Sequence, residues 1–154
     1  MLTDRGLSLQ SSANVFSVMM GVAAVFQLIG GYVGDRIETR IALAIFGFVQ
    51  AVGFTIAVFA QSMPTAILFA VLFGAGFGGR NPLTVAIRAE YFGPTAFATI
   101  TGISSAPMYL FMLAAPLFAA FMFDSQGSYM IAWLILGGLG AMSGVLFLFA
   151  KKPI

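Results

Sequence analysis

The sequence contains no histidine and no cysteine, and these two absences exclude most of the side chains that enzymes use for chemistry. Without them there are no thiol nucleophiles, no disulfides and no imidazole bases, and the usual ligands of zinc, haem and iron–sulfur clusters are missing. The five carboxylates are scattered rather than paired, so general acid–base catalysis has little support. We therefore expect a protein that is not an enzyme and that holds no cofactor and no metal ion.

Charge is scarce as well, at only 8% of the residues, whereas a soluble domain carries about 25%. Hydrophobic residues account for 60% of the chain, and the mean hydropathy is +1.03. So little charge could not cover a globular surface, which means that the solvent for most of the chain is lipid. The net charge of +2 does not indicate a nucleic-acid partner, because most basic residues lie in turns or at the ends of apolar runs. The composition predicts an all-α integral membrane protein.

Several apolar runs are long enough to cross a bilayer, which requires roughly 20 residues of helix. The connections between them are short. Ser62-Met63-Pro64 is typical of a helix N-cap followed by proline in the first turn, and Tyr91–Thr95 and Asp124–Ser128 are typical of tight turns. The sequence thus predicts five transmembrane helices, at about residues 13–33, 41–60, 65–87, 97–123 and 129–150.

The densest cluster of charge follows the first apolar run, in Gly30–Arg40, which reads GGYVGDRIETR. A turn this short between two membrane-length helices predicts that they form an antiparallel pair. With five spans, one side of the membrane would hold nearly all basic residues: Arg36, Arg40, Arg88, Lys151 and Lys152. Arg5 alone falls on the other side. The positive-inside rule therefore predicts a cytoplasmic C-terminus and an external N-terminus.

Small residues recur at four-residue spacing in three of the predicted spans, as Gly30/Gly34, Gly74/Gly78 and Gly140/Gly144. Such spacing lets helix backbones approach closely, although glycine is common in membrane helices for other reasons. The run at 74–79 is the densest, so we expect a helix crossing or a flexible segment there. Prolines inside the spans, at Pro82, Pro107 and Pro116, predict kinks.

Arg80 is the most informative single residue, because it lies inside the third span, about 12 Å deeper than Arg88, and is followed by Asn81. An arginine at this depth is costly and normally faces a cavity or a partner. One interpretation is a fixed cation that binds an anionic substrate, such as a carboxylate. The other is an arginine that snorkels to the interface or pairs with a carboxylate. The sequence places no carboxylate at mid-span depth.

Other polar residues lie inside the spans. Thr101, Ser105 and Tyr109 share one helix face and could line an aqueous path, or they could bond to backbone or to a neighbouring helix. The remaining ones are Asn14, Ser17, Gln27, Gln50 and Ser104.

Charges of both signs gather at the predicted cytoplasmic face. Asp35, Arg36, Glu38 and Arg40 share the first turn, and Arg88 and Glu90 lie at the end of the third span. They predict an ion-pair latch between helices, weak enough to open and close, since surface pairs contribute roughly 0–1 kcal/mol. The alternative is a solvated turn that merely obeys the positive-inside rule.

The segment from Gly31 through Gly34, Asp35 and Arg36 to Arg40 resembles the cytoplasmic signature of the major facilitator superfamily. In that family the signature joins the second and third helices and recurs more loosely between the eighth and ninth. Here Glu38 stands where glycine is usual and Thr39 where a basic residue is usual. Such departures are typical of the second copy.

The rest of the chain is similar to the eighth to twelfth helices of a twelve-helix transporter, over essentially all 154 residues. The segments Gly76–Pro82 and Glu90–Gly93 resemble the tenth helix and its exit in the oxalate/formate and monocarboxylate branch. Leu2–Ser8 resembles the external turn that enters the eighth helix.

The resemblance implies a partial C-terminal bundle of a secondary active transporter that works by alternating access in a bacterial or archaeal plasma membrane. Its substrate would be a small organic anion such as a monocarboxylate, with the proton as a candidate coupling ion. Arg80, Asn81, Ser105 and Tyr109 would contact the substrate. We expect a fragment whose missing seventh helix and N-terminal half act as its partner. The alternative is a stand-alone five-span subunit, channel-like or for assembly, that oligomerises through its glycine faces.

Overall fold

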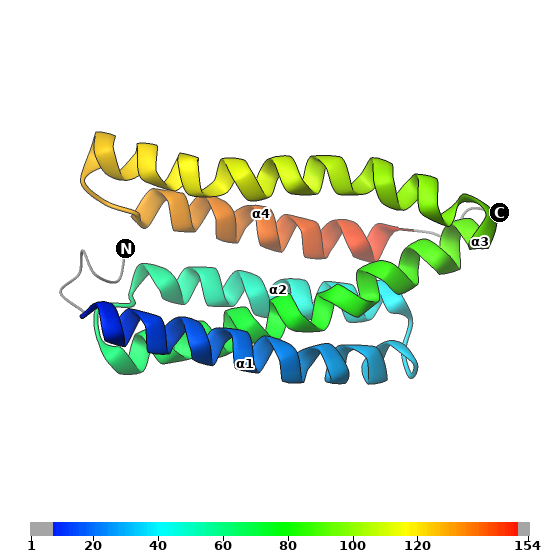
Figure 1. Ribbon diagram of the computed structural model, residues 1–154, viewed down its shortest axis with the longest axis horizontal. Coiled ribbons are helices and arrows are strands. Elements are labelled where there is room, and N and C mark those ends of the chain that lie inside the picture. Colours follow the sequence, from blue (N-terminus) through cyan, green and yellow to red (C-terminus); the bar gives the residue numbers. More distant parts are fainter. Residues whose placement is uncertain (1–7, 151–154) are drawn as a thin grey trace.

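The computed structural model describes residues 8–150, and regular structure in this part of the chain is entirely helical (Figure 1). The helices are α1 (Leu9–Gly34), α2 (Thr39–Val58), α3 (Met63–Gln126) and α4 (Met130–Phe149). Each is long and apolar enough to cross a membrane. The expectation of an all-α protein with helices of membrane-spanning length is therefore confirmed.

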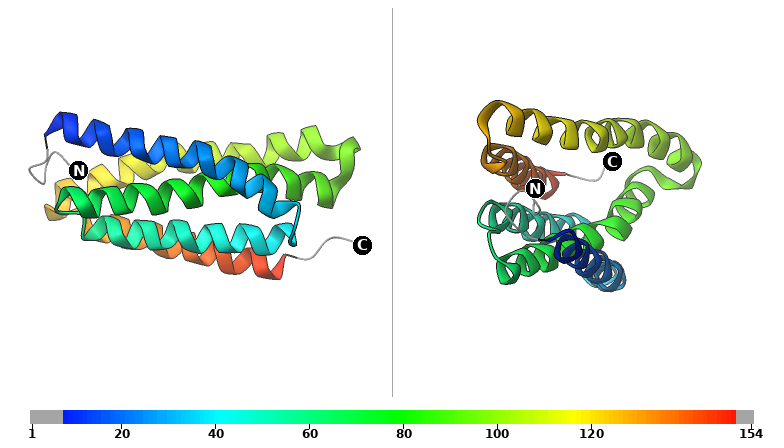
Figure 2. Two further views of the ribbon diagram at one scale, coloured as in Figure 1. Left: turned by 90° about the horizontal axis from the view of Figure 1, so that it is seen from below. Right: turned by 60° about the vertical axis from the view of Figure 1, so that its left-hand side comes forward.

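The expected number of helices was wrong, because the structure counts four across the described residues where the sequence predicted five. The predicted third and fourth spans both belong to α3, which has 64 residues. At Gly93 the backbone leaves the helical region, with φ 67° and ψ 179°. This conformation is essentially restricted to glycine. Because a single residue reverses the chain, helical structure resumes directly after it, and α3 doubles back on itself (Figures 1 and 2).

The two arms of α3, residues 63–92 and 94–126, are each about 30 residues long, which corresponds to roughly 45 Å of helix. The first arm begins as the sequence predicted, at the N-cap Ser62 with Pro64 in the first turn. The Ser62 backbone N–H donates to Thr65 Oγ1 at 3.1 Å. The second arm ends at Gly127, whose φ of 66° provides the left-handed C-cap that closes a helix.

Small residues let the first arm of α3 run between α1 and α2, as the glycine run at 74–79 predicted. Gly78 faces α1, where an added Cβ would lie 2.7 Å from the Cα of Ala23. Gly76 faces α2, where an added Cβ would lie 2.7 Å from the Cα of Gln50. The prediction that α1 and α2 form an antiparallel pair is correct for their directions but not for their packing. They run antiparallel but pack mainly against α3, since the glycines allow α3 a closer approach to both (Figure 2).

The best-packed region lies where α1, α2 and the first arm of α3 meet, around Leu43, Phe46, Leu83 and Ile87. The second arm of α3 is different, because most of its large apolar side chains face outward. Leu110, for example, is 67% exposed. Such exposure fits a helix whose solvent is lipid rather than water.

The α1–α2 turn, the reversal of α3 and the C-terminal end of α4 lie at one end of the bundle, and the α2–α3 and α3–α4 connections lie at the other (Figure 1). Tyr91 secures the first end, because its hydroxyl donates to the Ala150 carbonyl at 3.0 Å. Arg36, Arg40 and Arg88 are therefore gathered at one end, as the sequence predicted.

Candidate functional site

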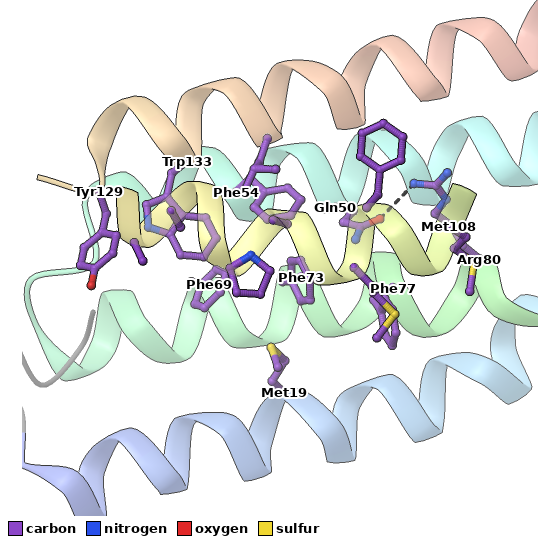
Figure 3. A pocket seen from close by; sticks show the side chains of 17 residues that line it. Met19, Gln50, Phe54, Phe69, Phe73, Phe77, Arg80, Met108, Tyr129 and Trp133 are labelled. Carbon is purple, nitrogen blue, oxygen red and sulfur yellow. Dashed lines mark hydrogen bonds between the residues drawn. The ribbon is translucent and has the colours of Figure 1, made fainter. Parts of the chain in front are cut away.

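A cavity of about 800 Å³ lies between the second arm of α3 and the other helices (Figure 3). The second arm lines one side through residues such as Met108, Met112 and Pro116. The first arm of α3, α2 and α4 line the opposite side, mainly with aromatic rings, and α1 adds Met19. Volumes of about 300–1,000 Å³ are typical of small-molecule sites.

Arg80 lies at one end of this cavity, and its side chain is held by two helices besides its own. Nη1 donates to Gln50 Oε1 of α2 at 3.0 Å, and Nη2 donates to Ser143 Oγ of α4 at 3.0 Å. The Phe147 ring of α4 lies beneath the guanidinium, with its centroid 5.7 Å from Cζ. The arginine is thus fixed in position between α2 and α4 and lines the cavity (Figure 3).

The partners of Arg80 are neutral. Within residues 8–150 the structure contains one ion pair, between Arg40 and Glu38, and it does not involve Arg80. The described carboxylates Asp35, Glu38, Glu90 and Asp124 all lie at helix ends or in turns. The bonds to Gln50 and Ser143 use two of the five N–H donors of a guanidinium, so three remain for a further acceptor.

Aromatic side chains form a continuous wall that leads away from Arg80. Phe77, Phe73 and Phe69 succeed one another at four-residue spacing along the first arm of α3. Phe73 and Phe77 stack with their centroids 6.0 Å apart, and Phe54 of α2 meets Phe73 edge-on at 5.0 Å. Trp133 of α4 continues the wall through Phe54 and Phe69, at 5.6 and 5.8 Å (Figure 3).

The other predicted substrate contacts do not join Arg80 in this cavity. Asn81 is exposed, and Tyr109 is 63% exposed; Ser105 is half-buried. None of the three belongs to the cavity lining that the structure describes. Thr101, on the same face as Ser105 and Tyr109, has a buried hydroxyl oxygen with no hydrogen-bond partner among the described residues. The shared face therefore lies apart from the Arg80 cavity.

The charged residues of the α1–α2 turn make fewer ion pairs than a latch would suggest. Arg40 pairs with Glu38 inside the turn, and Arg36 lies over the Tyr32 ring, with Cζ 4.6 Å from its centroid. The contact between helices comes from Thr39, whose hydroxyl donates to Glu90 Oε2 at 3.0 Å. Thr39 is the residue that replaces the basic residue usual in the signature.

The remaining signature and latch residues lie around the same turn. Gly34 packs against the Leu83 side chain, and Gly31 has open space beside it. Asp35 is exposed and Arg88 is half-buried. The end of the bundle therefore carries the predicted residues, while the ion pairs across helices that were expected are replaced by the bond from Thr39 to Glu90.

Sequence reasoning missed the α4 side of the site. Ser143 lies between Gly140 and Gly144, in a stretch that indicates helix packing, and packing alone was inferred from it. The two glycines do pack, against Ala51 and Ala44 of α2. Ser143 and Phe147 are four residues apart and so share one helix face. Gln50 was recognised as a polar residue within a span, but its partner was not.

Comparison with known proteins agrees with the resemblance of the signature turn. The family model of the Major Facilitator Superfamily matches residues 1–154. The chain is also similar to Monocarboxylate transporter 2 of Mesocricetus auratus, with 24% identity over 156 residues that cover 98% of this chain and 32% of that protein. The chain thus spans about a third of the length of this relative. A match over the whole chain shows that it belongs to the major facilitator superfamily, which also agrees with the expectation that it is not an enzyme.

Proposed function

We propose that this chain contributes to a secondary active transporter that moves a small organic anion, such as a monocarboxylate, by alternating access. The observation that carries the proposal is Arg80, a cation inside a membrane-spanning helix that lines an apolar cavity and is held by the neutral side chains of Gln50 and Ser143. A cation held this way keeps its charge available for an anion. The relative that is named as a monocarboxylate transporter adds support for the substrate class.

A carboxylate suits the geometry of this arginine well. The planar guanidinium matches the two oxygens of a carboxylate, and such bidentate bonds are about twice as strong as bonds between neutral groups. Gln50 and Ser143 fix the plane of the fork, so less rotamer entropy is lost when the anion binds. Asn81, Ser105 and Tyr109 lie outside this cavity lining. Their role as substrate contacts therefore stays a prediction for the complete protein.

The test is uptake of a radiolabelled monocarboxylate by cells that express the complete gene product. We expect Arg80→Ala and Arg80→Lys to abolish uptake while membrane insertion stays normal, because lysine keeps the charge but cannot form the bidentate fork. Gln50→Ala should lower uptake severalfold, since it releases one side of the guanidinium. Gln27→Ala is the matched control, because Gln27 is an exposed glutamine on α1 outside the cavity lining. Unchanged uptake by Arg80→Ala would refute the substrate contact.

We further propose that each arm of α3 crosses the membrane separately, which gives five crossings. Each arm is roughly 45 Å long, and the hydrocarbon core is only about 30 Å thick. With the arginine-rich end in the cytoplasm, position 38 would be internal and position 125 external. In a cysteine-free background, an impermeant maleimide should label Ser125→Cys on intact cells, and Glu38→Cys only after permeabilisation. Labelling of both on the same side would contradict the arrangement.

The α1–α2 turn is proposed as one side of a cytoplasmic latch, with Asp35 and Arg36 exposed for a partner segment. The bond from Thr39 to Glu90 ties this turn to the arm of α3 that also carries Arg80. Movement of the turn is therefore coupled to the proposed substrate contact. The alternative of a subunit that oligomerises through glycine faces has less support, because the three predicted glycine pairs already contact neighbouring helices within the chain.

A further inference from the structure

We infer that the anion that binds in this cavity has an extended aromatic or other apolar body with a single carboxylate at one end. This inference rests on the proposed function and names the substrate class of the same cavity. Its basis is the separation of the cavity into a cationic end at Arg80 and a long aromatic wall that runs away from it.

The aromatic wall extends well beyond the reach of a small acid. Eleven residues of helix separate Phe69 from Arg80, which corresponds to about 16 Å along α3. The rings of Phe69 and Phe73 have centroids 5.7 Å apart, and Phe73 stacks on Phe77, so the wall is continuous. A three-carbon hydroxy acid bound at Arg80 would leave most of the 800 Å³ cavity without contact.

The lining also excludes a second charged group on the ligand. Arg80 is the only basic side chain among the residues described as lining the cavity. A dicarboxylate would have to place its second carboxylate against rings of phenylalanine and tryptophan, where an unpaired charge is costly. A monoanion with an apolar body avoids this cost.

Direct binding to the purified complete gene product tests the inference without requiring transport. Trp133 is the only tryptophan in this chain and lines the cavity, so a ligand on the aromatic wall should change its fluorescence. Each buried methylene tightens binding about fourfold. We therefore expect 3-phenylpropionate to bind at least tenfold more tightly than propionate, and a matched dicarboxylate to bind more weakly than either. Trp133→Phe identifies the signal that comes from this site.

Variants of the wall separate a direct contact from a general loss of structure. Phe73→Ala should reduce the preference for 3-phenylpropionate to less than threefold, because Phe73 contacts the rings on both sides of it. Phe73→Leu keeps most of the apolar volume and serves if the alanine variant does not fold. Phe16→Ala is the control, since Phe16 is exposed on α1 outside the cavity lining, and it should leave the preference unchanged.

The outcomes distinguish the inference from the proposed function. Equal affinities for propionate and 3-phenylpropionate, or equal weakening of both by Phe73→Ala, would overturn the inference even if uptake is measured. Binding of 3-phenylpropionate with no uptake of any carboxylate would contradict the proposed transport and leave the inference standing. A tenfold preference that depends on Phe73 and on Arg80 supports the aromatic monoanion.

Discussion

Replacement of Gly76 by alanine tests whether the close approach of α3 to α2 positions Arg80. The nearest atom to an added Cβ would be the backbone nitrogen of Gln50, at 2.5 Å, whereas ordinary contact begins at 3.4 Å. Because the opposing atom is backbone and cannot rotate away, the helices must separate by the difference between these distances, about 0.9 Å. If this shift carries through to the side chains, the bond from Arg80 to Gln50 lengthens from 3.0 Å to about 3.9 Å, where it is no longer a hydrogen bond.

The expected cost combines overpacking with loss of this bond. Overpacking of a close contact costs about 1–3 kcal/mol. We expect Gly76→Ala to lower the temperature at which the purified protein loses its monodisperse peak in size-exclusion chromatography, and to reduce uptake as Gln50→Ala does. Gly21→Ala is the matched control on α1, because an added Cβ there meets nothing within 4 Å. If Gly76→Ala proved as stable and as active as Gly21→Ala, the reasoning would be refuted.

Two further predictions concern the reversal of α3 and the signature turn. Gly93→Ala should destabilise the protein by about 1–3 kcal/mol in thermal denaturation, because its backbone conformation is restricted to glycine. Gly102→Ala, which also meets no atom within 4 Å but lies in regular helix, should be neutral or stabilising. Thr39→Val removes the bond to Glu90, so we expect stability to change by less than about 1 kcal/mol. When Thr39→Val is combined with Met108→Cys, which places a thiol in the cavity lining, labelling from the cytoplasmic side should increase relative to Met108→Cys alone. Unchanged labelling would argue against the latch.

The helices themselves could be predicted from the sequence because lipid imposes a simple rule. A segment without water must satisfy its backbone internally, so each apolar run of sufficient length becomes a helix. The ends followed from local chemistry, as at Ser62, where the cap and Pro64 mark the first turn. The number of helices could not be predicted from the same rule. Whether Gly93 separates two helices or bends one depends on a single pair of dihedral angles, which composition does not determine.

The packing partners were harder to predict than the helices. The glycine run at 74–79 indicated a crossing, but not that its two faces would meet different helices. Gly78 faces α1 and Gly76 faces α2, since residues two apart on a helix point in different directions. A short turn makes α1 and α2 consecutive in the chain, but they make few contacts with each other. The closer approach that glycine permits decided in favour of α3 as the partner of both.

Arg80 was identified from sequence because a charge in an apolar run is conspicuous, whereas its partners are not. Gln50 lies 30 residues before it and Ser143 lies 63 residues after it. Nothing local in either segment specifies a partner at that distance, since the pairing depends on how α2 and α4 are placed around α3. Ser143 was hidden further by its glycine neighbours, because small residues have packing as their simplest explanation.

The neutral partners of Arg80 favour a binding role over a purely structural one. A buried arginine that only stabilises a fold is best neutralised, because an uncompensated charge at this depth costs a few kcal/mol. Gln50 and Ser143 orient the guanidinium without removing its charge, and the carboxylates in the described part of the chain lie at the helix ends. An arginine in this state gains most from an anion that enters the cavity. A transporter requires such a gain to be reversible, which a permanent ion pair with a fixed carboxylate would prevent.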